Sequence, residues 1–387
     1  EQQAPGGGFY SATDADSEGV EGRYFLWTQA QLIAVLGKSD GALVAEIYGA
    51  TAVGNFEGSN ILHLTTPIAM WAERKGLPEG KLRARLDNAL ERLRIARKER
   101  VPPLRDDKIL TAWNGLMISA LARAGFMLSE PRYTAAAAHA ADDLLANQRD
   151  KQGRLLRLRL NGQAKGKAFM DDHAFLIDGL LELLHATGEV RWLRSAMALQ
   201  REQDGWHAAP RGAGFFRTAS DAESLLARDK PAHDGALPGG NSLAALNLLR
   251  LGALTGEASW VNGAKATLRA FSRRLRGYPF ALTRMLEAVE TQAWPLKEVV
   301  LVRPEKGEPA DFEPMLNALR QNWQPHYVLL TVAMGADHAE LARLAPIIRQ
   351  KVARDGRVTA YVCHEGACRL PTTRPQELIK QLLARDR

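Results

Sequence analysis

The stretch that decides the fold is Arg105–Gly125, RDDKILTAWNGLMISALARAG, in which charged residues and a Trp-Asn pair precede an apolar segment. Apolar residues recur every three and four positions over Lys108–Ala124, which predicts an α-helix that is buried nearly all round. Gly125 is the expected end of this helix. Asp106 and Asp107 precede or enter its first turn, where free backbone N–H groups favour carboxylates. We therefore expect the two aspartates either to cap the helix or to belong to a site.

Two kinds of helix alternate along the sequence, beginning with the helix in this stretch. The mostly apolar kind comprises Lys108–Ala124, Asp171–Thr187 and Asn241–Thr255. The other kind carries one apolar stripe and a polar face, and comprises Pro131–Gln148, Arg191–Gln203 and Ala258–Leu275. Inner and outer helices of a ring would have these compositions. The sequence therefore predicts a mostly α fold, an (α/α) toroid of helical hairpins.

A partial internal repeat supports the toroid. Gly6–Asp14 reads GGGFYSATD and Gly212–Ser220 reads GAGFFRTAS, each an aromatic segment that leads into a loop and then a helix. Gly153–Leu160 is a third candidate hairpin. The first copy opens Gly6–Trp27, where two aromatic strands are expected to pair around an acidic turn. Repeats of this kind predict a funnel lined by the loops before the inner helices.

After Pro295 the pattern changes to alternating strands and helices, which predicts a small α/β subdomain over 296–387 behind a toroid portion over 1–295. It contains no Gly-rich phosphate loop, and we expect neither a cofactor nor a metal. Cys363 and Cys368 are expected to be reduced, ordinary buried thiols, because their spacing matches neither a zinc site nor a thioredoxin motif. A redox or metal role is the alternative.

Composition narrows the class of protein. The chain has 387 residues, of which 46% are hydrophobic and 25% charged, as in ordinary globular proteins. Its net charge of +7 is spread over helical faces, and the most basic run, Lys81–Arg105, has leucines at helical spacing, so no nucleic-acid partner is expected. No apolar run is long enough for a membrane span. Two cysteines in such a length indicate a reducing compartment, the cytoplasm.

Six segments together resemble the spermatogenesis-associated, thioredoxin-domain-containing protein family. They are GGFYSATDADSEGVEGRYFLW, GNFEGSNILH, RDDKILTAWNGLMISALARAG, DDHAFLIDGLLELLHATG, DGALPGGNSLAALNLLRLGALTG and AYVCHEGAC. The resemblance implies a helical part similar to the N-acylglucosamine 2-epimerase and six-hairpin glycosidase folds. Members of the family also carry an N-terminal thioredoxin-like domain and about two further hairpins, so this chain resembles a C-terminal portion with an incomplete toroid and an incomplete site. Gly239 stands where the family more often has Ser.

The toroid geometry would gather polar residues at the starts of the inner helices. We predict acid–base catalysis by Asp107, Asp172, His173 and Asp234, and substrate binding by Asp14, Asp16, Glu57, Arg105, Trp113, Asn114 and Asn241. Glycoside hydrolysis needs one protonated and one ionised carboxyl group, whereas epimerisation beside a carbonyl needs a base and an acid on opposite faces of the carbon. Asp171 is expected to cap its helix while Asp172 faces the funnel. His173 either acts in the site or bonds to Asp171 or the backbone.

Two functions remain open from the sequence. The first is a carbohydrate-active enzyme, a sugar epimerase or isomerase or a glycoside hydrolase, that works on a small sugar substrate in the funnel. The second is a non-catalytic helical scaffold that binds a ligand or partner and serves the thioredoxin-like redox domain. The fold alone cannot decide between them, because toroids host many unrelated functions.

Overall fold

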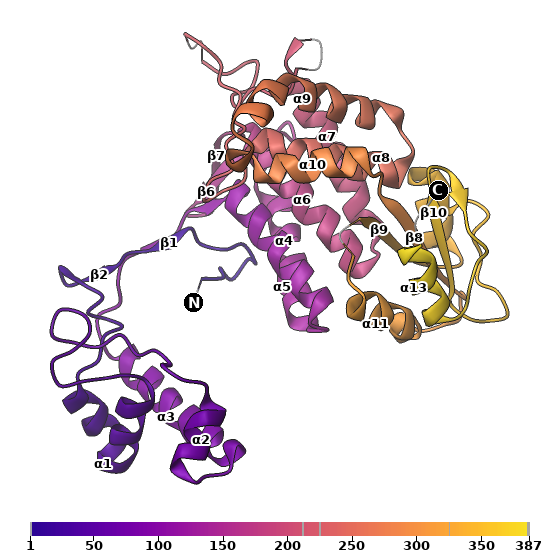
Figure 1. The fold of residues 1–387 in the computed structure, drawn as a ribbon. Helices are drawn as coiled ribbons and strands as arrows, with labels where there is room; N and C mark the ends of the chain where they lie inside the picture. Colours follow the sequence, from indigo (N-terminus) through magenta and orange to yellow (C-terminus); the bar gives the residue numbers. More distant parts are fainter. Residues whose placement is uncertain (1, 211–212, 224–225, 325, 385–387) are drawn as a thin grey trace. The chain divides into compact units, whose positions relative to one another are not determined.

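A computed structural model describes residues 2–210, 213–223, 226–324 and 326–384. The chain divides into two compact units, one formed by residues up to 11 together with those from 107 onward, the other by residues 12–106 (Figure 1). Each unit has its own hydrophobic core. None of the helices in these described ranges combines the length and apolar character that crossing a bilayer requires.

The first unit is built on helical hairpins. Its inner helices are α4 (Thr111–Met127), α6 (Met170–Thr187) and α8 (Gly240–Thr255), and α4 and α8 both pack on α6. Each is followed by an outer helix that packs against it, namely α5 (Pro131–Asn147), α7 (Val190–His207) and α9 (Ala258–Gly277). The helix α10 (Thr283–Ala293), which is not among the predicted helices, packs on α8. This arc of inner and outer helices confirms the predicted incomplete (α/α) toroid.

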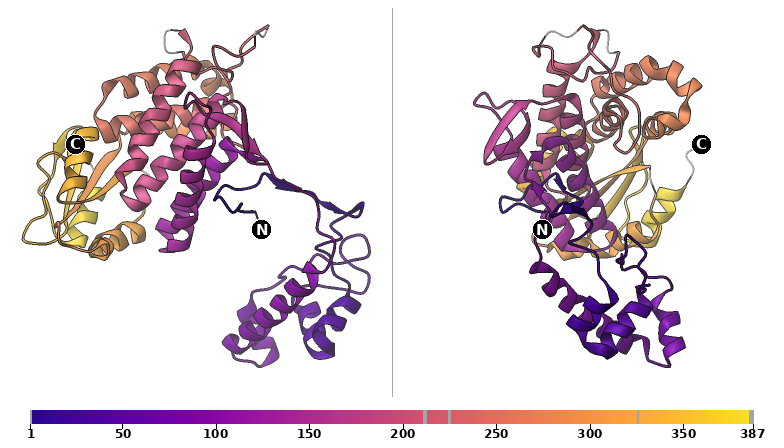
Figure 2. Two further views of the ribbon diagram at one scale, coloured as in Figure 1. Left: turned by 180° about the vertical axis from the view of Figure 1, so that it is seen from behind. Right: turned by 90° about the vertical axis from the view of Figure 1, so that its left-hand side faces the viewer.

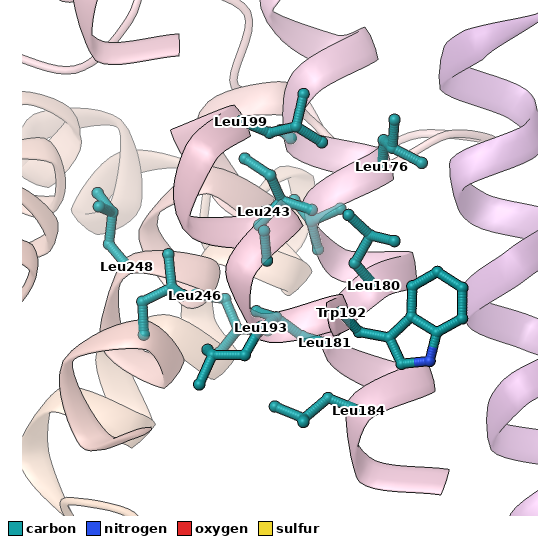
Figure 3. Packing of buried hydrophobic residues seen from close by; sticks show 14 of the residues in the cluster. Leu176, Leu180, Leu181, Leu184, Trp192, Leu193, Leu199, Leu243, Leu246 and Leu248 are labelled. Atoms are coloured by element: carbon teal, nitrogen blue, oxygen red, sulfur yellow. The ribbon is translucent and has the colours of Figure 1, made fainter. Parts of the chain in front are cut away.

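The inner helices pack closely because small and apolar residues face one another. Leucines of α6, α7 and α8 pack together in the core, with Trp192 at one side of the group (Figure 3). Gly115 of α4 and Gly179 of α6 lie where the two backbones touch: a Cβ at Gly115 would sit 2.4 Å from the Phe175 carbonyl carbon, and one at Gly179 would sit 2.7 Å from the Gly115 oxygen. Any side chain at either position would force the helices apart.

The helix α4 differs from its prediction in one respect. It begins at Thr111 and ends at Met127, and its side chains Trp113 and Met117 are 43% and 42% exposed. The expected burial nearly all round is therefore wrong for α4, although it holds for α6 and α8. The reason is position, since α4 stands at the end of the arc and packs on α5 and α6 only on one side.

Short strands cover the N-terminal end of α4. β5 (Ile109–Leu110) pairs with β6 (Leu156–Leu160), which pairs with β7 (Gln163–Lys167), so the predicted third hairpin is present but extends further along the chain. Its turn residues Asn161 and Gly162 both have positive φ, as a tight hairpin requires. Asp106 lies in β4 (Arg105–Asp106) and Asp107 follows it, so neither aspartate reaches the first turn of α4 and the predicted caps are wrong.

The C-terminal segment confirms the predicted α/β subdomain. Its sheet has the order β11-β10-β8-β9, from Ala367–Cys368, Thr359–His364, Lys297–Arg303 and Tyr327–Ala333; β8 and β9 are parallel, while β10 is antiparallel to β8. The helices are α11 (Glu313–Gln321), α12 (Ala336–Leu344) and α13 (Pro375–Leu383). This sheet and the β6–β7 hairpin lie at opposite ends of the inner helices (Figures 1 and 2).

The two faces of the sheet enter different cores. Val300 and Val302 of β8 join the core of the inner helices, whereas Val299 and Leu301 join a second core with α11 and α13. This alternation follows from the period of two along a strand. The boundary predicted near residue 295 therefore marks a change of secondary structure but no break in packing.

Cys363 and Cys368 form a disulfide, so the expectation of reduced thiols is wrong. They face each other across the antiparallel pair β10–β11, joined by a turn in which Glu365 and Gly366 both have positive φ. The hairpin thus brings together two sulfurs whose spacing in the sequence matched no known motif.

The second unit contains α1 (Gln29–Ile47), α2 (Ile68–Lys75) and α3 (Glu79–Lys98) around a small core. Its strands are short: β1 (Ala12–Thr13) pairs with β4, and β2 (Asp16–Ser17) pairs with β3 (Val20–Glu21) across the acidic turn. The predicted pairing of the two flanking aromatic segments is wrong, because Phe9 belongs to the first unit and Trp27 to the core of the second.

Candidate functional site

Asn114 and Asn241, both predicted to bind substrate, form side-chain hydrogen bonds to the backbone. The Oδ1 of Asn114 accepts from the Phe9 N–H at 2.6 Å, and its Nδ2 donates to the Phe9 carbonyl at 3.0 Å. Asn241 makes the same pair of bonds to Phe215, at 2.7 and 2.9 Å. Phe9 and Phe215 occupy equivalent positions in the two repeat segments, so the repeat seen in the sequence corresponds to a repeated contact at the starts of α4 and α8.

Asp172 has the role expected of Asp171. Its side chain is buried, and its two oxygens accept from the Ala112 N–H in the first turn of α4 at 2.9 Å and from the Phe169 N–H at 2.7 Å. Asp172 therefore caps the starts of two helices at once. Burial raises the pKa of Asp172 to about 7, against the effect of these backbone bonds.

Asp171 lies beside the start of α8. Its Oδ1 is buried without a hydrogen-bond partner among the described residues, and its Oδ2 lies 3.7 Å from the Arg217 guanidinium. A Cβ added at Gly240 would come within 2.0 Å of this Oδ1, so the glycine makes room for the carboxyl group. Burial raises the pKa of Asp171 above its ordinary value.

His173 is buried near the start of α6, with 1% of its surface exposed. Its Nδ1 lies 3.2 Å from the Phe169 carbonyl oxygen and its Nε2 lies 3.4 Å from Glu202 Oε1. Burial would raise the pKa of Glu202, but the contacts with His173 and with the Leu155 N–H hold it at about 2. The ring of His173 therefore contacts the backbone, and its role in a site stays a prediction.

Asp234 closes the loop before α8. Its Oδ1 accepts from the Gly239 N–H at 2.6 Å, while its Oδ2 accepts from the Arg284 N–H at 2.9 Å, in the first turn of α10. The Ser242 hydroxyl adds a bond of 3.2 Å. These contacts join the loop to α8 and α10 and account for Asp234 as a capping residue.

The other predicted residues are not gathered into one described site. Asp107 and Trp113 are exposed in the first unit. Asp14, Asp16, Glu57 and Arg105 belong to the second unit, where all are exposed and Glu57 sits in a turn with φ of 45°. In the described parts of the chain, no cluster of three or more His, Cys, Asp or Glu side chains is arranged to hold a metal ion.

A cavity of about 290 Å³ lies at the other end of the inner helices, under the α/β subdomain. We call it the Glu182 cavity. It is lined by Arg123, Phe126, Met127, Glu182, His185, Leu246, Arg250, Arg284, Glu287, Glu290, Thr291, Leu296, Trp323, Gln324, His326 and Tyr327. These residues come from α4, α6, α8 and α10, from the segments that lead into β8 and β9, and from the first residue of β9.

A charged network forms the inner wall of the cavity. Glu182 Oε1 lies 2.9 Å from guanidinium nitrogens of both Arg123 and Arg250. One turn earlier, Asp178 accepts from Arg250 at 3.0 Å and from the Ser119 hydroxyl at 2.7 Å. Burial opposes the charge of Glu182, yet the two arginines hold its pKa at about 2, so the carboxylate stays ionised.

The cavity is also lined by tyrosine and histidine side chains. The Tyr327 hydroxyl is buried without a hydrogen-bond partner among the described residues, and the same is true of His326 Nδ1. His326 Nε2 lies 3.3 Å from Glu290 Oε1. Burial raises the pKa of Tyr327 and lowers that of His185 to about 4, so both are neutral near pH 7.

The sequence held one signal for this cavity. Asp178 and Glu182 stand one helical turn apart in the otherwise apolar run DDHAFLIDGLLELLHAT, and buried carboxylates are rare unless they are paired. The sequence held no such signal for the side chains that contact these two carboxylates or that share the cavity with them. Arg123 and Arg250 come from other helices, and His326 and Tyr327 lie about 140 residues further along the chain.

The chain was compared with known proteins. No family model matches it. Over 97% of its length it is 35% identical to human spermatogenesis-associated protein 20 and 36% identical to the rat protein. This chain is a homologue of spermatogenesis-associated protein 20. It spans about half of that protein's length, 52%, and the matched half is the C-terminal part. An uncharacterised protein of Caenorhabditis elegans, B0495.5, is 29% identical over 96% of the chain and 54% of its own length.

Solved structures with partial likeness are enzymes that act on sugars. Cellobiose 2-epimerase from Spirochaeta thermophila aligns with a TM-score of 0.36 and 16% identity, over 42% of this chain and 43% of its own. The GH76 α-mannanase BT2949 of Bacteroides thetaiotaomicron aligns with a TM-score of 0.40 and 13% identity, over 49% and 52%. These TM-scores are low, so neither likeness assigns an activity to the chain.

Proposed function

We propose that this chain is a carbohydrate-active protein that binds a small polyhydroxylated molecule of monosaccharide class in the Glu182 cavity. The observation that carries the proposal is the buried hydroxyl of Tyr327, which lines the cavity and has no partner in the described chain. A buried polar atom without a partner is costly, and a bound ligand would satisfy it. The cavity volume is close to the lower end of the range for small-molecule sites.

The lining suits hydroxyl groups. A sugar hydroxyl both donates and accepts, so it can bond to the ionised Glu182 carboxylate and to the guanidiniums of Arg123 and Arg250. The network fixes these groups before a ligand arrives, which lowers the cost of binding. Trp323 is one of the lining residues, and 53% of its surface is exposed. Its ring could cover one apolar face of a sugar.

Among carbohydrate reactions, the groups favour an epimerase or isomerase over a glycoside hydrolase. Hydrolysis needs one protonated and one ionised carboxyl group, and Glu182, which is held ionised, could supply only the second. Proton transfer beside a carbonyl needs instead a base near neutrality. His326 has one ring nitrogen close to Glu290 and the other without a partner in the described chain, so it can accept a proton while the carboxylate stabilises the imidazolium.

The test is a panel of monosaccharides and sugar phosphates, followed by saturation-transfer NMR for binding and by exchange of C–H protons in D₂O for turnover. Tyr327→Phe removes only the hydroxyl and should weaken binding about tenfold, because one hydrogen bond to a buried group is lost. Tyr278→Phe, at an exposed tyrosine outside the cavity lining, is the matched control and should bind like the parent. Equal binding by both variants would overturn the site.

A second function is favoured by a different observation. The side chains of Asn114 and Asn241 bond to backbone groups, and Asp234 bonds to backbone N–H groups and to the Ser242 hydroxyl, as a scaffold requires. In this case the chain binds a ligand or partner without turning it over, and serves a redox domain. Binding of a sugar without proton exchange would favour this function. The catalytic roles of Asp107, Asp172, His173 and Asp234 stay predictions.

A further inference from the structure

The disulfide in the α/β subdomain joins one buried and one accessible sulfur. Cys363 lies in β10, in the interior of the sheet, and is 1% exposed. Cys368 lies in β11, at the edge of the sheet, and is exposed. An external thiol can therefore reach Cys368, while Cys363 is shielded.

A buried lysine contacts the accessible sulfur. Lys351 is 7% exposed, and its Nζ lies 3.4 Å from Cys368 Sγ and 2.7 Å from the Ile347 carbonyl oxygen. A neutral disulfide gains little from an ammonium group. The thiolate that forms on reduction gains much more, because a nearby cation lowers the free energy of the ionised sulfur.

A carboxyl group stands on the other side of the disulfide. Glu298 of β8 is the direct antiparallel partner of Cys363, so both side chains leave the same face of the sheet. Its Oε2 is buried and has no hydrogen-bond partner within the described residues. Burial raises the pKa of Glu298 to about 7, so near neutrality it can hold a proton beside the buried sulfur.

The disulfide contributes little to the stability of the fold. It links residues that are five apart and already paired by the β10–β11 hairpin. A disulfide stabilises a fold mainly by closing a long loop of the unfolded chain, and this loop is short. The ionisable groups Lys351 and Glu298 beside the disulfide are therefore better explained by chemistry than by stability.

We propose that Cys363–Cys368 is a redox-active disulfide that exchanges with an external dithiol, with Cys368 as the attacked sulfur and Lys351 as the residue that stabilises its thiolate. A thiolate of the dithiol attacks Cys368 Sγ, the S–S bond breaks, and its electron pair leaves on Cys363, which takes a proton from Glu298. The second thiol of the dithiol then displaces Cys368 as a thiolate beside Lys351. The disulfide is reduced by two electrons and the dithiol is oxidised to its own disulfide.

The first experiment measures the reduction equilibrium of the whole chain in buffers of reduced and oxidised dithiothreitol, read by thiol alkylation and mass spectrometry. Lys351→Met should shift the equilibrium about tenfold towards the disulfide, the change that one unit of thiol pKa produces. Lys351→Arg, which keeps the charge, should restore most of the shift, and Lys380→Met, at an exposed lysine on α13, should leave it unchanged. A disulfide that never forms in the oxidised buffer, or one whose equilibrium is the same in Lys351→Met, would overturn the proposal.

The second experiment identifies the attacked sulfur. Cys363→Ser leaves Cys368 as the single thiol, and Cys368→Ser leaves Cys363. With 5,5′-dithiobis(2-nitrobenzoate), Cys363→Ser should form the mixed disulfide at least about tenfold faster, because its thiol is accessible and paired with Lys351. Circular dichroism establishes that both variants are folded. Equal rates, or faster reaction of Cys368→Ser, would contradict the assignment.

Discussion

Asn114 forms hydrogen bonds to both backbone polar groups of Phe9. Its Oδ1 accepts from the Phe9 N–H at 2.6 Å, and its Nδ2 donates to the Phe9 carbonyl oxygen at 3.0 Å. Asn241 forms the same two hydrogen bonds to Phe215. An asparagine suits this contact because its amide offers one acceptor and two donors on a short, rigid side chain. The remaining Nδ2 hydrogen of each asparagine also bonds to backbone, at Leu110 or Pro231. The inner helices thus anchor the segments that precede them.

The first prediction follows from these contacts. Asn114→Ala and Asn241→Ala should each lower the free energy of unfolding by about 2–3 kcal/mol, because buried backbone groups lose their partners. Urea denaturation measures the loss. The control is Asn317→Ala on α11, whose contact with Arg320 is exposed and should be worth less than about 0.5 kcal/mol. Unchanged stability in the Asn114 and Asn241 variants would restore both residues as candidates for ligand binding.

The second prediction concerns the two aspartates at the start of α6. Asp172→Ala removes the acceptors of two helix-start N–H groups and should destabilise the fold by about 2 kcal/mol. Asp171→Ala should change stability by less than about 0.5 kcal/mol, or raise it, because its Oδ1 is buried without a partner in the described chain. Thermal unfolding of the two variants compares them directly. A larger loss for Asp171→Ala would return the cap to the residue that the sequence favoured.

The third prediction is a pH dependence. The pKa of Glu182 is lowered from 4.5 to about 2 in the folded chain, so its contribution to stability is fully present above pH 4.5 and is lost as the pH falls towards 2. Glu182→Gln should cost about 3 kcal/mol at pH 7, since Arg123 loses its carboxylate partner and Arg250 keeps only that of Asp178. The difference between parent and variant should shrink between pH 4.5 and pH 2 in urea denaturation. A difference independent of pH would show that the carboxylate charge does not stabilise the fold.

The fourth prediction compares a glycine that is packed against a neighbouring helix with one that has open space beside it. Gly115→Ala should destabilise the fold by about 2–3 kcal/mol although alanine favours a helix, because its Cβ would press on the backbone of α6. Gly205→Ala on α7 has no atom within 4 Å of the new Cβ and should stabilise the fold by about 0.5–1 kcal/mol. Differential scanning calorimetry of both variants tests the contrast. Equal melting temperatures would mean that α4 and α6 are not in backbone contact at Gly115.

The helices could be predicted from the sequence because their signals are local. α6 was expected over Asp171–Thr187 and runs from Met170 to Thr187, and α8 was expected over Asn241–Thr255 and runs from Gly240 to Thr255. Periodicity and a terminal glycine decide such boundaries within one or two turns. The exposed side of α4 could not be predicted, because it depends on which neighbour packs against each face.

The site residues were harder to predict because a side chain's role depends on which group it meets. Asp171 and Asp172 have the same chemistry and adjacent positions, and only the approach of α4 makes Asp172 the cap. Cys363 and Cys368 likewise meet only because β10 and β11 form a hairpin. In both cases the contact that decides the role joins two groups whose distance in space could not be read from their positions in the sequence.

By itself, the sequence determined the helical hairpins, the repeated aromatic segments before α4 and α8, and the change to an α/β subdomain after Pro295. All of these arise from periodicity and from turn residues within one stretch of chain. Only the tertiary structure decided that residues 12–106 form a separate unit, that Glu182 meets arginines of two other helices, and that a lysine contacts Cys368. The physical reason is that packing and electrostatics act between neighbours in space, and the fold chooses these neighbours from distant parts of the chain.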